Sequence, residues 1–205
     1  MIKVGITGNI GSGKTTVCRI FEILGIPVYY ADDRAKELLQ SDKEIIEQVK
    51  KLFGEDVYDA NNRLDKKRVA HVVFNEPEFL KQYEAIIHPA VIRDGEKWFQ
   101  RHAQFPYAIK EAALLFESGG YKHLDKTICV TAPVNIRIKR IQERDGLDTE
   151  DILARMRNQM AEAEKVELSD FIIYNDGTAP LIRQVLNIHE KLLELDKKQD
   201  QFERN

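Results

Sequence analysis

Apolar and polar residues alternate at the start of the chain, and the period of this pattern changes within twenty residues. The alternation between Ile2 and Ile6 predicts a short strand. From Val17 to Leu24 the apolar spacing becomes i, i+3, i+4 and i+7, which predicts a helix with one apolar face. A glycine-rich stretch joins the two patterns. The first 25 residues therefore predict a strand, a tight turn and a helix.

Four later apolar runs, each close to a proline, a glycine or a group of polar residues, predict further strands. They are residues 27–30, 106–109, 127–131 and 170–175. Gly25 and Pro27 end the first helix. Helical patterns separate the strands, and the last helix carries apolar residues between positions 181 and 193. This order predicts an α/β fold with a mostly parallel sheet and helices on both faces. The order of the strands does not follow from the pattern.

Residues 42–104 form the least strand-like part of the chain. Apolar spacing predicts three helices there, with a polar turn over residues 56–64. The third helix is interrupted at His88, because a proline disfavours helical geometry in the residue before it, and we expect a new helix to begin at Pro89. His88 is then either a cap near the ligand crevice or a satisfied, half-buried histidine, and spacing alone favours the second interpretation.

Composition narrows the class of protein. Of the 205 residues 43% are hydrophobic and 32% are charged, which is typical of a soluble domain. The formal charge of −3 gives no reason to expect a nucleic-acid partner. We expect no membrane span, because no apolar run approaches ~20 residues, and no signal peptide, because the first strand follows Met1 directly. With only Cys18 and Cys129, a reducing cytoplasmic location is expected, and no obligate protein partner is evident. We expect residues 197–205 to be a frayed charged tail.

The turn after the first strand matches G-x-x-x-x-G-K-[ST] in full, from Gly8 to Thr15. Glycines let the backbone approach an anion and turn successive N–H groups toward it, and the helix N-terminus adds positive charge. Lys14 can reach the β- and γ-phosphates of ATP, and the Thr15 hydroxyl can bind Mg²⁺. The alternative is a chance glycine turn with a solvated lysine. The strand before it and the helix after it favour the phosphate-binding interpretation.

Acidic residues follow two of the predicted strands. In an open α/β sheet the ligand crevice lies outside the carboxyl ends of the strands. We expect one of Asp32 and Asp33 to cap the next helix and the other to act on a ligand, and we prefer Asp32 for the second role. Glu111 and Glu117, on either side of a short apolar run, could face the crevice or lie on a solvated rim.

Arg137, Arg140 and Arg144 are spaced i, i+3 and i+7, which places them on one face of a helix. A solvated helix face is the usual explanation for such a stripe. In a chain with a phosphate-binding loop, a mobile arginine-bearing lid is a serious competitor, because a closing arginine neutralises charge on a transferred phosphoryl group.

Several segments together resemble the dephospho-coenzyme A kinase family. The matching positions lie in the family's order over nearly the whole chain: 7–17, 24–28, 31–32, 87–89, 114–118, 140 and 144, 157–159, and 170–175 with 177. Many kinases share the loop, whereas Ile87-His88-Pro89 and the segment from Leu114 to Glu117 are more particular.

The resemblance implies a P-loop kinase fold with a five-stranded parallel sheet. It implies one domain with a core (1–41, 105–133 and 165–200), a helical CoA-binding subdomain (about 42–104) and a lid (about 134–164). The implied reaction is ATP- and Mg²⁺-dependent phosphorylation of the ribose 3′-hydroxyl of dephospho-CoA. The catalytic residues would be Asp32, Lys14 and Arg140. ATP would be bound by Gly11, Ser12, Gly13, Lys14, Thr15, Thr16, Arg140 and Asn175. The acceptor would be bound by Asp32, His88, Leu115, Phe116 and Glu117.

The sequence departs from the family pattern at two positions. Tyr30 replaces the first acid of a frequent Asp-Ala-Asp motif, which puts a metal role at that position in doubt, and Ala113 replaces a frequent proline. Two other functions remain as alternatives to this kinase reaction. A regulatory nucleotide switch is disfavoured, because no Asn-Lys-x-Asp or Asp-x-x-Gly motif occurs. Against another small-molecule P-loop kinase, acting on a nucleoside or nucleotide, the residue pattern gives no decisive argument, and only the resemblance discriminates.

Overall fold

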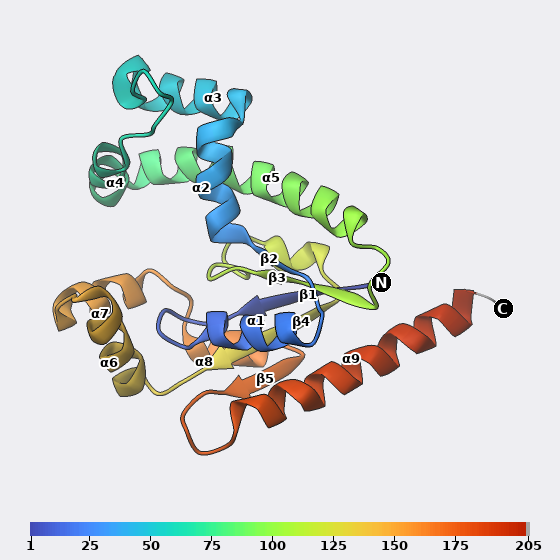
Figure 1. The fold of residues 1–205 in the computed structure, drawn as a ribbon. Helices are drawn as coiled ribbons and strands as arrows, with labels where there is room; N and C mark the ends of the chain where they lie inside the picture. The colour runs from blue at the N-terminus through green and yellow to red at the C-terminus, as the bar shows by residue number, and fades with distance from the viewer. Residues whose placement is uncertain (204–205) are drawn as a thin grey trace. The chain divides into compact units, whose positions relative to one another are not determined.

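A five-stranded parallel sheet with the strand order β2-β3-β1-β4-β5 carries the phosphate-binding loop (Figure 1). The strands are β1 (Ile2–Thr7), β2 (Val28–Tyr30), β3 (Tyr107–Glu111), β4 (Lys126–Thr131) and β5 (Phe171–Tyr174). β1 lies in the middle of the sheet. Most of its residues are buried, which suits a central parallel strand that is covered on both faces. The predicted parallel α/β fold is confirmed.

The computed structural model describes residues 1–203 and divides into two compact units. The first unit contains Met1–Tyr30 and the chain from Trp98 onward, and the second contains Ala31–Lys97. The second unit therefore begins at Ala31, ahead of the boundary at residue 42 that we expected for the helical subdomain.

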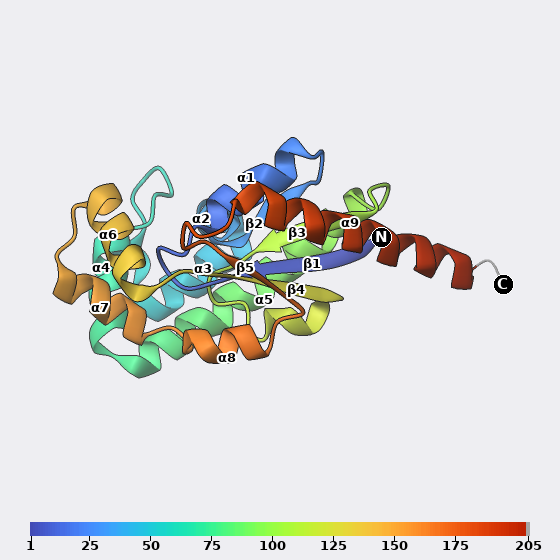
Figure 2. The same ribbon diagram turned by 90° about the horizontal axis from the view of Figure 1, so that it is seen from below.

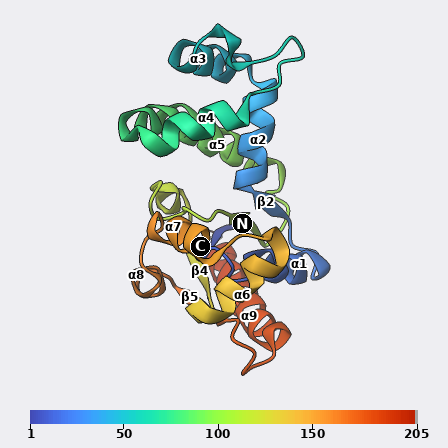
Figure 3. The same ribbon diagram turned by 90° about the vertical axis from the view of Figure 1, so that its left-hand side faces the viewer.

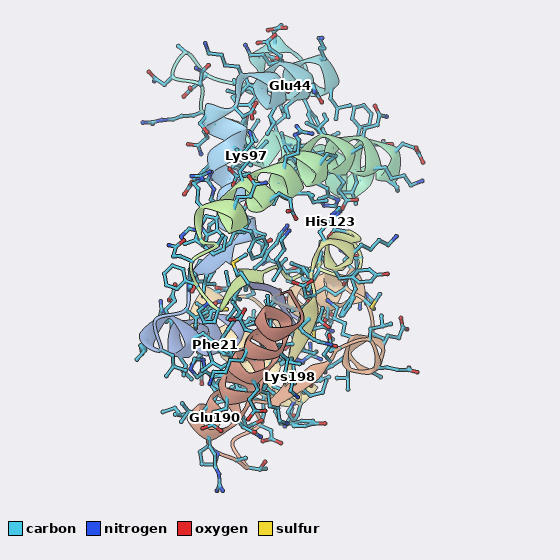
Figure 4. All side chains as sticks on the ribbon, turned by 90° about the vertical axis from the view of Figure 1, so that its right-hand side faces the viewer. Phe21, Glu44, Lys97, His123, Glu190 and Lys198 are labelled. Carbon is cyan, nitrogen blue, oxygen red and sulfur yellow. The ribbon has the colours of Figure 1, made fainter. Side chains whose placement is uncertain are left out.

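Helices cover both faces of the sheet in the first unit. α1 (Lys14–Ile23) and α9 (Leu181–Glu203) pack on one face, and α8 (Glu162–Glu167) lies against the other, as Figure 2 shows. Phe21, which Figure 4 labels, is fully buried in the core that α1 and α9 share with the sheet. α6 (Val134–Asp145), α7 (Thr149–Arg157) and the short η2 (Gly120–His123) complete this unit. α9 is helical as far as Glu203, into the segment expected to fray, and residues 204–205 lie outside the described part.

The second unit is helical, as the sequence predicted. It contains α2 (Ala31–Ser41), α3 (Lys43–Phe53), η1 (Glu55–Val57), α4 (Lys66–Asn75) and most of α5 (Pro77–Arg101), and Figure 3 shows these helices. Asp42 and Asp65 cap α3 and α4 with side-chain hydrogen bonds to backbone N–H groups. Arg34 of α2 donates two hydrogen bonds, of 3.0 and 2.9 Å, to the carboxylate of Asp94 on α5. Such a bidentate pair fixes the two helices relative to one another.

Two local predictions in this unit are wrong. α5 continues through Pro89 instead of turning at His88, because Ile87, Ala90 and Val91 are all buried and their packing outweighs the cost of a proline inside the helix. Asp33 is not a helix cap, since α2 begins at Ala31 and places both aspartates in its first turn. The expected polar turn over residues 56–64 includes part of η1 and an antiparallel bridge between Tyr58 and Leu64.

None of the helices within residues 1–203 is long and apolar enough to cross a membrane. Cys18 and Cys129 are both free and buried. Burial raises the pKa of the Cys129 thiol to about 11, so this cysteine stays protonated and packs as a small apolar residue.

Candidate active site

The loop between β1 and α1 takes a backbone course that only glycine allows at two of its positions. Gly13 has a φ of 96°, and a Cβ atom there would lie 2.1 Å from the side-chain nitrogen of Asn175. At Gly8 a Cβ atom would lie 2.2 Å from the carbonyl oxygen of Val130 on β4. The glycines therefore let the loop pack against the ends of β4 and β5. This close packing fixes the loop at the carboxyl edge of the sheet.

Lys14 lies in the first turn of α1, and its ammonium group turns back over the loop. Nζ donates a hydrogen bond of 2.9 Å to the carbonyl oxygen of Gly8 and lies 3.8 Å from Oε1 of Glu111. Glu111 ends β3, where it is in register with Ile6 and Tyr30, and only 7% of its surface is exposed. The solvated-rim interpretation of Glu111 is therefore wrong. Its position directly after a buried strand was the signal that pointed to the crevice.

Ser12, Thr15 and Thr16 place three hydroxyl groups around the same turn. Thr15 and Thr16 are exposed at the N-terminus of α1, whereas Ser12 is fully buried. The Ser12 hydroxyl has no hydrogen-bond partner within residues 1–203. A buried hydroxyl without a partner is costly, and an anion in the loop would satisfy it. The loop therefore fits the phosphates of a nucleotide.

Arg140 and Asn175 come from α6 and from the end of β5, and both contact the loop. Arg140 Nη1 lies 3.3 and 3.4 Å from the carbonyl oxygens of Gly11 and Ser12, and its Nη2 donates to the Asn175 carbonyl oxygen at 2.9 Å. Asn175 Nδ2 donates to the Ser12 carbonyl oxygen at 2.8 Å. The structure thus gathers Lys14, Arg140 and Asn175, which lie far apart in the sequence, around one loop.

The guanidinium groups of the other two arginines make different contacts, although the backbone of Arg137 lies close to Gly11 of the loop. Arg137 is 3% exposed; it donates to the Ala132 carbonyl oxygen at 2.9 Å and to Oε2 of Glu162 at 3.1 Å. Arg144 is exposed and pairs with its neighbour Asp145 at 2.8 Å. Neither side chain contacts the loop in the manner of Arg140. Of the three arginines, Arg140 alone thus places its guanidinium on the loop, whereas that of Arg137 is buried and that of Arg144 is exposed.

The segment after β3 is held by a buried lysine. Lys165 of α8 has no exposed surface; its Nζ donates to Oε1 of Glu117 at 2.9 Å and to the carbonyl oxygen of Ala113 at 2.8 Å. Burial alone would raise the pKa of Glu117, but the hydrogen bonds from Lys165 and from the Met160 N–H outweigh it and lower that pKa. Glu117 is thus ion-paired with a buried lysine, although the residue itself is exposed. Sequence reasoning missed Lys165, because a lysine in a polar helix gives no signal of burial.

Leu115 and Phe116, which were expected to bind the acceptor, belong to the core of the first unit. Leu115 is completely buried and Phe116 is 6% exposed. Their role toward the acceptor stays a prediction. We infer that these two residues shape the segment that carries Glu117.

Asp32 and His88 belong to the second unit. Asp32 is exposed in the first turn of α2, directly after β2 in the chain, and His88 is partly exposed in the middle of α5. Their roles toward a substrate stay predictions. Tyr30, which stands where an acid is frequent, ends β2; burial and neighbouring negative groups raise its pKa. Tyr30 therefore offers no carboxylate at this position.

The fold and the loop define the class of protein. A parallel sheet with β1 at its centre, a glycine-rich loop that leads into α1, and a lysine and an arginine on that loop are the features of a P-loop kinase. A shikimate kinase from Bacteroides thetaiotaomicron shares the fold, with a TM-score of 0.52 at 14% identity over 94% of this chain and 98% of that one.

Comparisons with known proteins identify the family within this class. The dephospho-CoA kinase family model matches residues 2–180. A dephospho-CoA kinase from Chlorobaculum tepidum is 42% identical over 94% of this chain and 95% of its own, and one from Bacteroides fragilis (strain YCH46) is 37% identical over 91% of each. The solved dephospho-CoA kinase from Campylobacter jejuni is 28% identical over 94% of this chain and 97% of its own, with a TM-score of 0.70. The chain belongs to the dephospho-CoA kinase family.

Proposed function

We propose that this protein transfers the γ-phosphate of ATP to the ribose 3′-hydroxyl of dephospho-CoA, which gives coenzyme A in the last step of its biosynthesis. The convergence of Lys14, Arg140 and Asn175 on the glycine loop carries the proposal. Together with membership of the family, it makes phosphoryl transfer from a nucleotide the activity that the site supports best.

On the donor side, the loop binds the phosphates of ATP. Backbone N–H groups of Gly11, Ser12 and Gly13 surround them, and the first turn of α1 adds Lys14, Thr15 and Thr16. Arg140 exchanges its carbonyl contacts for a phosphate oxygen, because a charged acceptor binds a guanidinium more strongly than a neutral one. Asn175 lies beside the adenine of ATP. A cavity of about 250 Å³ is lined in part by Tyr174 and Asp176, its neighbours in the chain.

The donor set at the loop suits Mg²⁺. Magnesium in kinases is usually held by one or two protein oxygens, with phosphate oxygens and water as the other ligands. The exposed Thr15 hydroxyl would hold the ion directly, and Glu111 would hold it through water, because its carboxylate lies beside Lys14. When bound, the ion neutralises charge on the β- and γ-phosphates.

On the acceptor side, Asp32 accepts the proton of the ribose 3′-hydroxyl as the hydroxyl oxygen attacks the γ-phosphorus. The carboxylate orients the hydroxyl by a hydrogen bond, and ADP leaves with the electron pair of the broken P–O bond. Lys14 and Arg140 stabilise the negative charge on the transferred group. His88 and Glu117 are the other residues that we expect on the acceptor side. Residues 134–164 act as the lid that brings Arg140 over ATP, and the reaction takes place in the cytoplasm without an obligate protein partner.

The experiment that tests this proposal is an acceptor assay with purified protein, γ-labelled ATP and Mg²⁺. Dephospho-CoA, adenosine and AMP are offered separately, and the phosphorylated position is read by NMR. We expect label on the 3′-oxygen of dephospho-CoA, at a kcat/KM well above that of the other acceptors. Preferred labelling of adenosine or AMP would support a nucleoside or nucleotide kinase instead.

A further inference from the structure

Two neighbouring residues between α7 and α8, Gln159 and Met160, bind the first part of the glycine loop. Gln159 Oε1 accepts a hydrogen bond of 2.8 Å from the N–H group of Ile10. The Met160 carbonyl oxygen accepts a hydrogen bond of 3.2 Å from the side-chain amide of Asn9, a residue that is only 5% exposed. The loop is thus held from outside by a segment that is distant in the sequence. No residue role discussed so far uses Gln159.

The peptide group between Asn9 and Ile10 is held at both of its polar atoms. Its carbonyl oxygen accepts a hydrogen bond of 3.0 Å from the Ser12 N–H group, within the loop itself. Its N–H group donates to Gln159. Because a peptide group is planar and rotates as one unit, the two bonds together fix the direction in which the chain enters Gly11. Gln159 supplies the one of these two bonds that the loop does not make by itself.

The segment that follows α7 is itself fixed within the first unit. The Met160 N–H group donates to Oε1 of Glu117 at 2.9 Å, and this carboxylate is paired with the buried Lys165. Lys165 Nζ also donates to the Ala113 carbonyl oxygen, which accepts a further hydrogen bond of 3.3 Å from the Thr7 hydroxyl at the end of β1. A side chain on a segment that is held in this way constrains the loop instead of following it.

We propose that Gln159 is a positioning residue for ATP, which holds the glycine loop in its phosphate-binding form before the nucleotide arrives. The inference rests on the proposed function, in which this loop binds the phosphates of ATP. The N–H groups that meet the phosphates follow directly after Ile10, so the orientation of its peptide group decides where they point. A loop that is ordered in advance spares the nucleotide the cost of ordering it. Gln159 therefore acts on ATP through the loop and not by direct contact.

The test removes the amide oxygen and keeps the length of the side chain. Gln159→Met makes this change at a partly exposed position. Gln142→Met is the matched control, because the Gln142 amide also joins two segments: it donates to the Thr149 hydroxyl at 3.1 Å, a bond from α6 to the start of α7 that involves no loop residue. Calorimetry gives the dissociation constants of ATP and of dephospho-CoA separately, and steady-state kinetics give kcat and both KM values. Amide hydrogen exchange follows the Ile10 N–H group, and thermal unfolding follows stability.

We expect Gln159→Met to raise the dissociation constant and the KM of ATP by about tenfold, because this is the effect of leaving one N–H group without its hydrogen bond. The Ile10 amide should exchange faster. The KM for dephospho-CoA should stay the same, and kcat should fall by less than about threefold, since the groups that stabilise the transferred phosphoryl group are still present. Gln142→Met should match the parent protein in all of these measurements.

An unchanged affinity for ATP in Gln159→Met would overturn the inference. Equal losses of affinity for both substrates together with a lower melting temperature would also overturn it, because a general loosening of the fold gives that result. The same loss of ATP affinity in Gln142→Met would overturn it as well. If the parent protein binds ATP but phosphorylates an acceptor other than dephospho-CoA, and only Gln159→Met weakens ATP binding, the positioning role stands and the proposed function fails.

Discussion

The two units hold their polar residues in different ways. In the first unit, charged side chains such as Lys165 and Arg137 are almost completely buried and bind carboxylates and backbone carbonyl oxygens. In the second unit, the pair between Asp33 and Lys36 is open to solvent, and Asp32 is exposed. The first unit therefore fixes its polar groups in a preorganised arrangement, as Lys14 and Arg140 are fixed on the glycine loop, whereas the second presents an exposed helix face.

This difference has an energetic consequence. A preorganised site stabilises charge without reorganisation at the moment of reaction, so removal of one of its groups lowers turnover strongly. An exposed surface that only binds a substrate contributes mainly binding energy, so its alteration changes affinity more than turnover. Asp32 is the exception in the second unit, because its proposed role is chemical. The predictions below test this division, from the largest expected effect to the smallest.

Lys14→Ala should lower kcat by at least about 10³-fold, because the ammonium group neutralises charge on the transferred phosphoryl group. Its contacts with Gly8 and Glu111 also shape the loop, so the melting temperature is measured beside the ATP kinetics. Turnover close to that of the parent protein would rule out the catalytic role of the loop. Thr16→Ala, on the same exposed turn, should be milder than Lys14→Ala, since it removes no charge.

Asp32→Asn should lower kcat by about 10²–10⁴-fold while the affinity for dephospho-CoA changes little. The amide keeps the shape of the side chain but cannot take the proton from the attacking hydroxyl. Single-turnover kinetics and calorimetry separate the two effects. Asp33→Asn is the control, because that side chain makes only an exposed ion pair in the same helical turn. A large loss in Asp33→Asn with normal turnover in Asp32→Asn would show that the assignment is reversed.

Arg140→Ala should lower kcat/KM for ATP by about 10²-fold, since one donor to the developing charge is lost. Arg144→Ala on the same helix provides the comparison: its pair with Asp145 is exposed, and we expect less than a twofold change. If the two variants lose the same activity, Arg140 has no special position over the loop. A loss of stability without loss of turnover would make the contacts with Asn175 and the loop purely structural.

The loop and the parallel sheet could be predicted from the sequence, because each depends on residues that are close together in the chain. Gly8 to Thr15 form one continuous motif, and each strand is a short apolar run with clear ends. Pro89 shows where local patterns fail: its effect on the backbone is local, but the buried residues that keep α5 intact depend on the packing of the whole unit.

The polar contacts of the site could not be predicted from local sequence patterns either. Arg140 and Arg137 occupy equivalent positions in the stripe, yet the guanidinium of Arg140 binds the loop and that of Arg137 is buried against Glu162. Only the tertiary arrangement distinguishes them. Burial of Lys165 and the position of Glu111 beside Lys14 also depend on segments that are distant in the sequence. The resemblance to a family supplied the role of Arg140, which spacing could not.

Glu117→Gln should destabilise the first unit by about 1–3 kcal/mol at neutral pH, because it leaves the buried Lys165 ammonium without its carboxylate. The pKa of Glu117 is held below its ordinary value of 4.5, so its contribution is present above that pH and is lost as the pH falls through the lower value of the folded state. Denaturant unfolding at pH 7 and pH 3 should therefore show a difference from the parent protein that shrinks with acid. Glu167→Gln on the exposed side of α8 should show almost no difference at either pH. A constant difference would mean that the amide acts through packing and not through the lost charge.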